Sequence, residues 1–186
     1  MSNELLNTLH KLAIINYSGA PFLFCYGITW LICGYLWHKF SAKTAVYITL
    51  FQGMVALPAA LGIMYAIGSF TYRPGDELLN QLSIIIAMSQ LLVIPILIVF
   101  IIKEQYTLVP FIFSLTGAVH FLLYTWLYQT YFYIAMPIVL SIGIAAIYSF
   151  GTRKGDYHPS IAAASQICLL TGVVLILTTV VLVAIH

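Results

Sequence analysis

A small set of polar side chains lies inside the long apolar runs of this sequence. His120 is the only ionisable residue deep inside such a run, apart from cysteines and tyrosines. An imidazole exchanges a proton near neutral pH, and amide and hydroxyl groups hold small molecules by hydrogen bonds. These residue types therefore predict a polar binding site rather than a catalytic centre. The candidate ligand-binding residues are His120, Gln90, Gln52, Gln166, Tyr124 and Thr116.

The same residues also permit a purely structural interpretation. His120 would then be neutral and would bond to Gln90, to a hydroxyl group or to a carbonyl group freed by a proline. Such bonds between membrane helices contribute about 0.6 kcal/mol on average and fix helix register. Because no acidic residue accompanies His120 inside the apolar runs, the functional and the structural interpretation both stay open.

Catalytic motifs are nearly absent from the sequence. The apolar runs hold no Asp or Glu pair for acid–base chemistry, and no G-x-S-x-G, H-E-x-x-H or phosphate-binding loop occurs. The other histidines lie at the ends of the runs or of the chain, and the three cysteines have no metal-ligand spacing. We therefore predict no catalytic residue, no metal and no cofactor, and an enzyme is the least favoured class.

The elements that carry these residues must lie in a membrane. The chain has 186 residues, of which 62% are hydrophobic and 6% are Asp, Glu, Lys or Arg. A soluble domain has about 25% charged residues, which it needs to cover its surface. Every charge here lies between apolar runs or in the N-terminal segment, as expected if a charge at bilayer depth costs several kcal/mol. The net charge of +2 does not indicate nucleic-acid binding.

The apolar runs predict an all-α bundle of about six transmembrane helices, because about 20 helical residues cross the hydrocarbon layer. The fourth and fifth runs are separated only by Gln129 and Thr130, which predicts a tight hairpin. Pro58 and Pro95 fall inside spans and remove backbone donors, so we expect kinks there. The expected spans of the transmembrane domain, residues 17–186, are 18–37, 45–70, 80–102, 109–128, 131–150 and 159–185.

Residues 1–16 differ from the spans. Leu5, Leu9, Leu12 and Ala13 recur at helical spacing among polar residues, which predicts a short amphipathic helix on the membrane surface. The alternative is a frayed terminus whose periodicity is accidental.

The basic residues predict the orientation of the spans. The loops at 38–44, 103–108 and 151–158 hold most of the Lys and Arg residues, and such loops stay in the cytoplasm. Both termini are therefore expected on the non-cytoplasmic side. The basic residues of these loops are Lys39, Lys43, Lys103, Arg153 and Lys154, whereas the opposite side holds only Lys11 and Arg73.

The expected spans place the candidate residues at two depths. His120 and Gln90 are roughly 17 Å and 15 Å into antiparallel neighbouring helices, near the midplane. Gln52 and Gln166 are each roughly 10 Å from the cytoplasmic side, one layer below. The fourth span carries a stripe of residues at four-residue intervals, Thr116, His120, Tyr124 and Tyr128. This stripe should face the interior, because lipid offers no hydrogen-bond partner to an imidazole.

Three short segments carry a resemblance to a family. They are G-A-P-F at 19–22, M-x-x-x-P at 54–58 and H-F-L-L-Y-T-W-L-Y at 120–128. Together with the layout of the spans, they resemble a group of small uncharacterised bacterial multi-pass membrane proteins, over residues 17–180. The resemblance implies a bacterial cell membrane and no particular activity.

The leading hypothesis is a small multi-pass protein that binds or transports a small neutral or weakly basic molecule through a midplane polar pocket. Its motive is an interior without charged residues but with a histidine, glutamines and tyrosines. The alternative is a non-catalytic scaffold or accessory subunit that packs against another membrane protein or against a second copy of itself. Small residues on the helix faces favour that alternative. The expected partners are membrane lipid and either the small molecule or the second protein, and not nucleic acid.

Overall fold

The computed structural model describes residues 3–72, 77–151 and 159–185. Within these ranges every regular element is a helix, which confirms the all-α class. Six helical stretches are long and apolar enough to cross a membrane. They are Tyr17–Leu36, Ala42–Ala66, Gln81–Ile102, Tyr106–Tyr128, Phe132–Phe150 and Ile161–Ala184, each within a few residues of the expected span.

The helix ends have local causes in the sequence. The Ser41 and Ser160 hydroxyls cap their helices by accepting hydrogen bonds from the backbone N–H groups of Thr44 and Ala163. Gln129 adopts a left-handed conformation (φ 51°) that ends the fourth span in a tight turn. The α-helices are α1 Asn3–Ile15, α2 Ala20–Leu36, α3 Ala42–Phe51, α4 Gly53–Ala66, α5 Glu77–Ser89, α6 Ile94–Ile102, α7 Val109–Tyr128, α8 Phe132–Gly151 and α9 Ile161–Ala184. The 3-10 segments are η1 Tyr17–Gly19, η2 Ser69–Thr71, η3 Gln90–Val93 and η4 Tyr106–Leu108.

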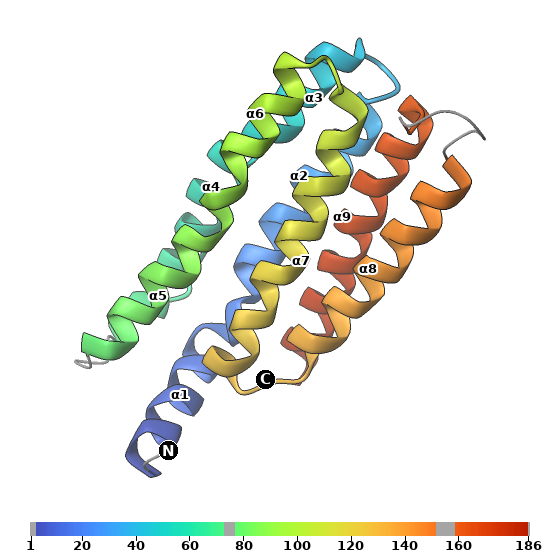
Figure 1. Ribbon diagram of the computed structural model, residues 1–186. Coiled ribbons are helices and arrows are strands. Elements are labelled where there is room, and N and C mark those ends of the chain that lie inside the picture. The colour runs from blue at the N-terminus through green and yellow to red at the C-terminus, as the bar shows by residue number, and fades with distance from the viewer. Residues whose placement is uncertain (1–2, 73–76, 152–158, 186) are drawn as a thin grey trace.

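The first and last spans, α2 and α9, form the most extensive helix pair (Figure 1). Glycines on α2 allow this approach, because a Cβ atom on Gly34 would lie 2.7 Å from Leu169 and one on Gly27 would lie 2.8 Å from Ile176. The Ser165 hydroxyl of α9 donates a hydrogen bond of 2.7 Å to the Gly34 carbonyl of α2. Small residues and a serine thus join the two helices without a charged group.

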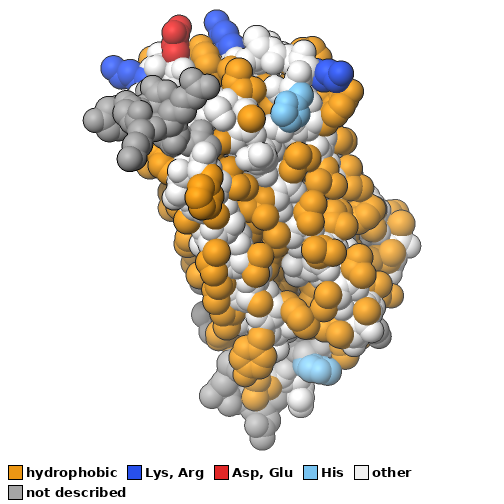
Figure 2. Space-filling view, turned by 90° about the vertical axis from the view of Figure 1, so that its right-hand side faces the viewer, with side chains coloured by type: hydrophobic (Ala, Val, Ile, Leu, Met, Phe, Trp, Pro, Cys, Tyr) orange, Lys and Arg blue, Asp and Glu red, His pale blue; other side chains and the backbone are white. Residues whose placement is uncertain are grey.

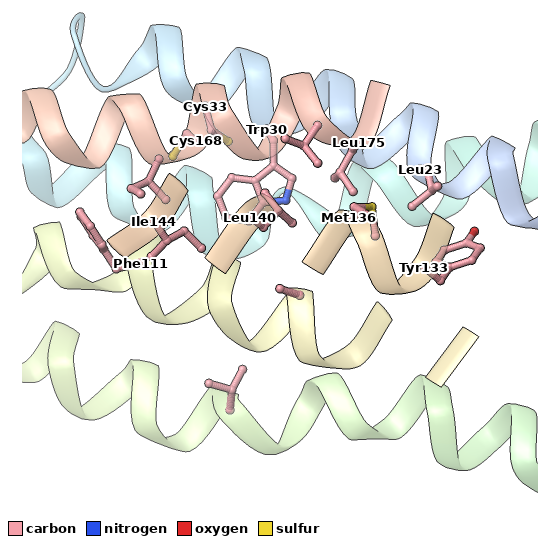
Figure 3. Packing of buried hydrophobic residues seen from close by; sticks show 14 of the residues in the cluster. Leu23, Trp30, Cys33, Phe111, Tyr133, Met136, Leu140, Ile144, Cys168 and Leu175 are labelled. Atoms are coloured by element: carbon pink, nitrogen blue, oxygen red, sulfur yellow. The ribbon is translucent and has the colours of Figure 1, made fainter. Parts of the chain in front are cut away.

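The other spans extend from this pair on both sides. On one side α4 packs against α2, while on the other α9 packs against α8, and α8 packs against α7. The third span, formed by α5, η3 and α6, packs mainly against α7. Figure 3 shows the buried core between α2, α7, α8 and α9, where Trp30, Leu140 and Leu175 meet.

The outer surface is apolar along the bundle. Figure 2 shows hydrophobic side chains over the length of the molecule, with Lys and Arg side chains gathered at one end. The described loops 38–44 and 103–108 lie at that end, and both termini lie at the other (Figure 1). The predicted cytoplasmic residues Arg153 and Lys154 lie outside the described residues.

Helix α1 packs its buried residues Leu9 and Ala13 against the bundle and contacts α7. It extends beyond the end of the bundle (Figure 1), and Lys11 Nζ lies 4.1 Å from the centre of the Tyr72 ring. The helix therefore exists as expected, although residues 1–2 lie outside the described part of the chain. Its position at the membrane interface, and the division of the chain at residues 16 and 17, stay predictions.

The second span breaks earlier than expected. The regular helix ends at Phe51 and restarts at Gly53, with Gln52 between them. Two N–H groups, those of Val55 and Ala56, bond to the Gln52 carbonyl, which shows the local change in pitch. Helix α4 then continues through Pro58, six residues after this interruption, and the kink expected at Pro58 itself stays a prediction.

Candidate functional site

The third span is interrupted near the middle of the bundle. Residues 90–93 form the 3-10 segment η3 between α5 and α6. Pro95 has no N–H group, so it cannot bond to the Leu91 carbonyl; the N–H of Ile94 bonds to that carbonyl instead. A 3-10 stretch thus lies just before Pro95 and carries Gln90, while the kink expected at Pro95 stays a prediction.

His120 of α7 faces this interruption. Its Nδ1 lies 2.8 Å from the hydroxyl oxygen of Ser89, the last residue of α5. The same hydroxyl donates a 2.7 Å hydrogen bond to the Ile86 carbonyl. His120 is half-buried. It is paired with the Ser89 hydroxyl group of the neighbouring span and not with Gln90.

Gln90 lies beside α7, one turn away from His120. Its Nε2 is 3.8 Å from the position that a Cβ atom would take on Gly117, an ordinary van der Waals distance, so the amide lies against this turn of α7. The Oε1 atom is buried and has no hydrogen-bond partner among the described residues. An unpaired buried acceptor costs about 1–3 kcal/mol, which marks this atom as one that a ligand could satisfy.

An aromatic cluster borders His120 towards the end of α7. The Tyr124 ring meets the imidazole edge-on, with centroids 5.2 Å apart, and stacks on Tyr128. Tyr133 of α8 completes the cluster, 5.6 Å from the Tyr124 centroid. Its hydroxyl donates a hydrogen bond to the Ser18 carbonyl and so fixes η1, the connection between α1 and α2. The stripe predicted on α7 is therefore continuous from His120 to Tyr128.

Thr116 contributes little to this site. Its hydroxyl lies 2.8 Å from the Ile112 carbonyl and 3.1 Å from the Phe113 carbonyl, both within α7. Because a hydroxyl has a single proton, Thr116 has no further donor for a ligand.

The two remaining glutamines lie apart from His120 and from each other. Gln52 is 6% exposed; the Cys33 thiol lies 3.8 Å from its Oε1, and its Nε2 has no partner in the described ranges. Gln166 is exposed, because its neighbours Ser165 and Ile167 are the residues that α9 turns inward. Of these two glutamines, which were predicted at one depth, only Gln52 lies in the interior.

The structure brings together His120, Tyr124 and Gln90, and it adds Ser89. Helix periodicity could have selected Ser89, because Ile86, Ser89, Val93 and Leu97 follow the i, i+3, i+4 spacing of a packed face. The Tyr133 contact joins residues that are 115 positions apart, and nothing local in the sequence signals it.

Other possible sites are distinct from this one. A groove of about 410 Å³ runs between α7 and α8 and is lined by residues such as Phe111, Leu115, Ser141 and Ala145. Phe111 is nine residues from His120, which places it on the opposite side of α7. Within the described ranges, no three His, Cys, Asp or Glu side chains come together as metal ligands would.

Comparison with known proteins identifies a family but no function. No curated protein and no solved structure matches the chain. A family model does match, over residues 6–182, which includes every residue of the site described above. The chain belongs to this family, DUF7010, which is described as a family of unknown function.

Proposed function

We propose that this chain is a multi-pass protein of a bacterial cell membrane that binds, or moves across the membrane, a small neutral or weakly basic molecule. The molecule occupies the site at His120, Ser89 and Gln90, near the midplane. The observation that carries the proposal is the buried Gln90 Oε1, which has no partner in the described part of the chain. Its position at a 3-10 stretch inside a helix adds support, because such a stretch often marks a functional hinge.

The packing of the third span also supports movement. The segment α5–η3–α6 packs mainly on α7, and much of its surface is exposed, including Ile85, Leu92 and Ile102. An element with few buried contacts opens at low free-energy cost. This span can therefore shift against α7 and change access to His120 while α2, α8 and α9 stay packed.

Replacement of Gln90 tests the proposal. The purified full-length protein in detergent is heated with a panel of small neutral amines, amides and alcohols, and the melting temperature is recorded. A ligand at 100 times its Kd stabilises a protein by about 2.7 kcal/mol. We expect at least one compound to stabilise the wild type but not Gln90→Leu.

Gln166→Leu is the matched control, since it makes the same change at an exposed glutamine. It should keep the ligand response of the wild type. The free Gln90→Leu protein should be as stable as the wild type or more so, because the change removes an unpaired buried acceptor. A panel without a stabilising compound, or a response that Gln90→Leu retains in full, would contradict the proposal.

The groove between α7 and α8 favours a second candidate function, that of a scaffold or accessory subunit. Ser141, Ala145 and Ser149 recur every four residues along its α8 side, and small residues at this spacing let a further helix approach closely. Ala145→Leu would fill the groove. If the protein is such a subunit, this change should abolish its association with a partner or a second copy, as measured by native mass spectrometry.

A further inference from the structure

We infer that the molecule bound beside His120 is a hydrogen-bond donor, recognised through an N–H or O–H group, and that Ser89 is the positioning residue that sets this preference. The inference rests on the proposed function and specifies its ligand class. It depends on which ring nitrogen of His120 carries the proton. The contacts of Ser89 decide that point.

The single proton of Ser89 is already committed. Its hydroxyl donates to the Ile86 carbonyl at 2.7 Å, and a carbonyl oxygen can only accept. The same oxygen lies 2.8 Å from His120 Nδ1. The hydroxyl must therefore accept the second bond, and Nδ1 must donate it.

This assignment leaves Nε2 of a neutral imidazole with a lone pair and no proton. The ring is neutral because a charge at this depth costs several kcal/mol, and no acidic group contacts His120 among the described residues. No partner of Nε2 is found in the described ranges either. Nε2 is therefore a free hydrogen-bond acceptor.

Gln90 adds a second acceptor. Its unpaired buried atom is the carbonyl oxygen Oε1, whereas Nε2 of the amide lies against α7 at Gly117. Two acceptors, one from α7 and one from η3, thus lack donors in the same region. The nearby hydroxyl groups cannot supply a proton to these acceptors. Ser89 donates to the Ile86 carbonyl, and Thr116 donates to a carbonyl of its own helix. A donor such as a primary amine, an amide or an alcohol satisfies this arrangement, whereas a ketone or an anion adds another acceptor.

Nitrogen NMR of the full-length protein, labelled with ¹⁵N-histidine in lipid nanodiscs, tests the inference directly. His120→Gln identifies the His120 signals by their loss. We expect a one-bond coupling to a proton at Nδ1 and none at Nε2. A proton found on Nε2 instead would overturn the donor preference and would leave the proposed binding function standing.

Three probes of similar size and known polarity then distinguish the ligand classes. Aniline offers N–H donors and is uncharged at neutral pH, acetophenone offers only an acceptor, and toluene offers neither. We expect aniline alone to displace the Nε2 resonance by more than its linewidth. An equal displacement by acetophenone would refute the donor preference, whereas no displacement by any probe would refute the binding function as well.

Ser89→Ala tests the positioning role. Without the hydroxyl, Nδ1 has no fixed acceptor, so a proton should appear on Nε2 and the response to aniline should weaken several-fold. Thr178→Val is the control, because the Thr178 hydroxyl also bonds to a carbonyl of its own helix, that of Val174, but lies on α9. If Ser89→Ala keeps the proton on Nδ1 and the aniline response of the wild type, Ser89 has no positioning role.

Discussion

The position of a Cβ atom on Gly172 lies 2.8 Å from the carbonyl oxygen of Gly27. Helices α9 and α2 therefore meet at backbone distance, and a methyl group there must push them apart. We expect Gly172→Ala to destabilise the protein by about 1–3 kcal/mol, the usual cost of overpacking. The measurement is the free energy of unfolding in mild detergent.

Gly62→Ala is the control for this change. Gly62 lies inside α4, and no side chain or backbone beyond its own turn of helix lies within 4 Å of its Cβ position. Alanine should stabilise that helix by up to about 1 kcal/mol, because glycine is the poorer helix former. Equal effects of the two substitutions on the free energy of unfolding would show that the close backbone approach at Gly172 does not affect stability.

His120→Leu should destabilise the protein modestly, because it removes the bond to Ser89. Bonds of this kind between membrane helices contribute about 0.6 kcal/mol and at most about 1.7 kcal/mol. His120→Gln keeps a donor and an acceptor and should keep most of the stability. Thermal unfolding compares the three proteins, and a leucine variant as stable as the wild type would argue against any role of the pair in packing.

Tyr133→Phe should destabilise the connection between α1 and α2. Three consecutive residues there, Tyr17, Ser18 and Gly19, have φ values of 47°, 48° and 80°. Left-handed backbone is unfavourable for the two that are not glycine, and the Tyr133 hydroxyl holds it through the Ser18 carbonyl. We expect a loss of about 1–3 kcal/mol in unfolding free energy.

The neighbouring tyrosine supplies the control for that measurement. Tyr131 is 84% exposed, so Tyr131→Phe should leave stability unchanged. Hydrogen exchange should quicken at residues 17–19 in Tyr133→Phe alone. Unchanged exchange there would mean that other contacts hold the turn.

The orientation of the spans is open to labelling in intact cells. The native cysteines are buried, so a membrane-impermeant maleimide should find little background. From the distribution of Lys and Arg, Lys11→Cys should react from outside and Lys39→Cys should react only after the cells are opened. The reverse pattern would invert the topology.

Much of the fold could be predicted from the sequence because the bilayer imposes simple rules. Charged residues cannot enter the hydrocarbon, so their positions mark the ends of the spans. The order of packing could not be predicted in this way, because hydropathy does not say which span meets which. The pairing of α2 with α9 depends on glycines that are far apart in the chain and complementary only in three dimensions.

The level of His120 along the neighbouring span was predictable, but its partner was not. Counting residues placed His120 level with the end of α5, where Ser89 in fact meets it. The same counting could not tell that Gln166 faces outward, because the rotation of α9 about its axis is set by its contacts with α2 and α8. Nor could it show that the Thr116 hydroxyl donates its hydrogen bond within its own helix.

The contact between Ser165 and Gly34 also has a consequence for biogenesis. These residues are 131 positions apart, so at about 5–20 residues per second α9 leaves the ribosome roughly 7–26 s after α2. During that interval the glycine face of α2 has no partner, and α8 lacks its contact with α9. Docking of α9 is then the step that closes the bundle, and mutations at this contact should act first on the yield of folded protein that escapes proteolytic quality control.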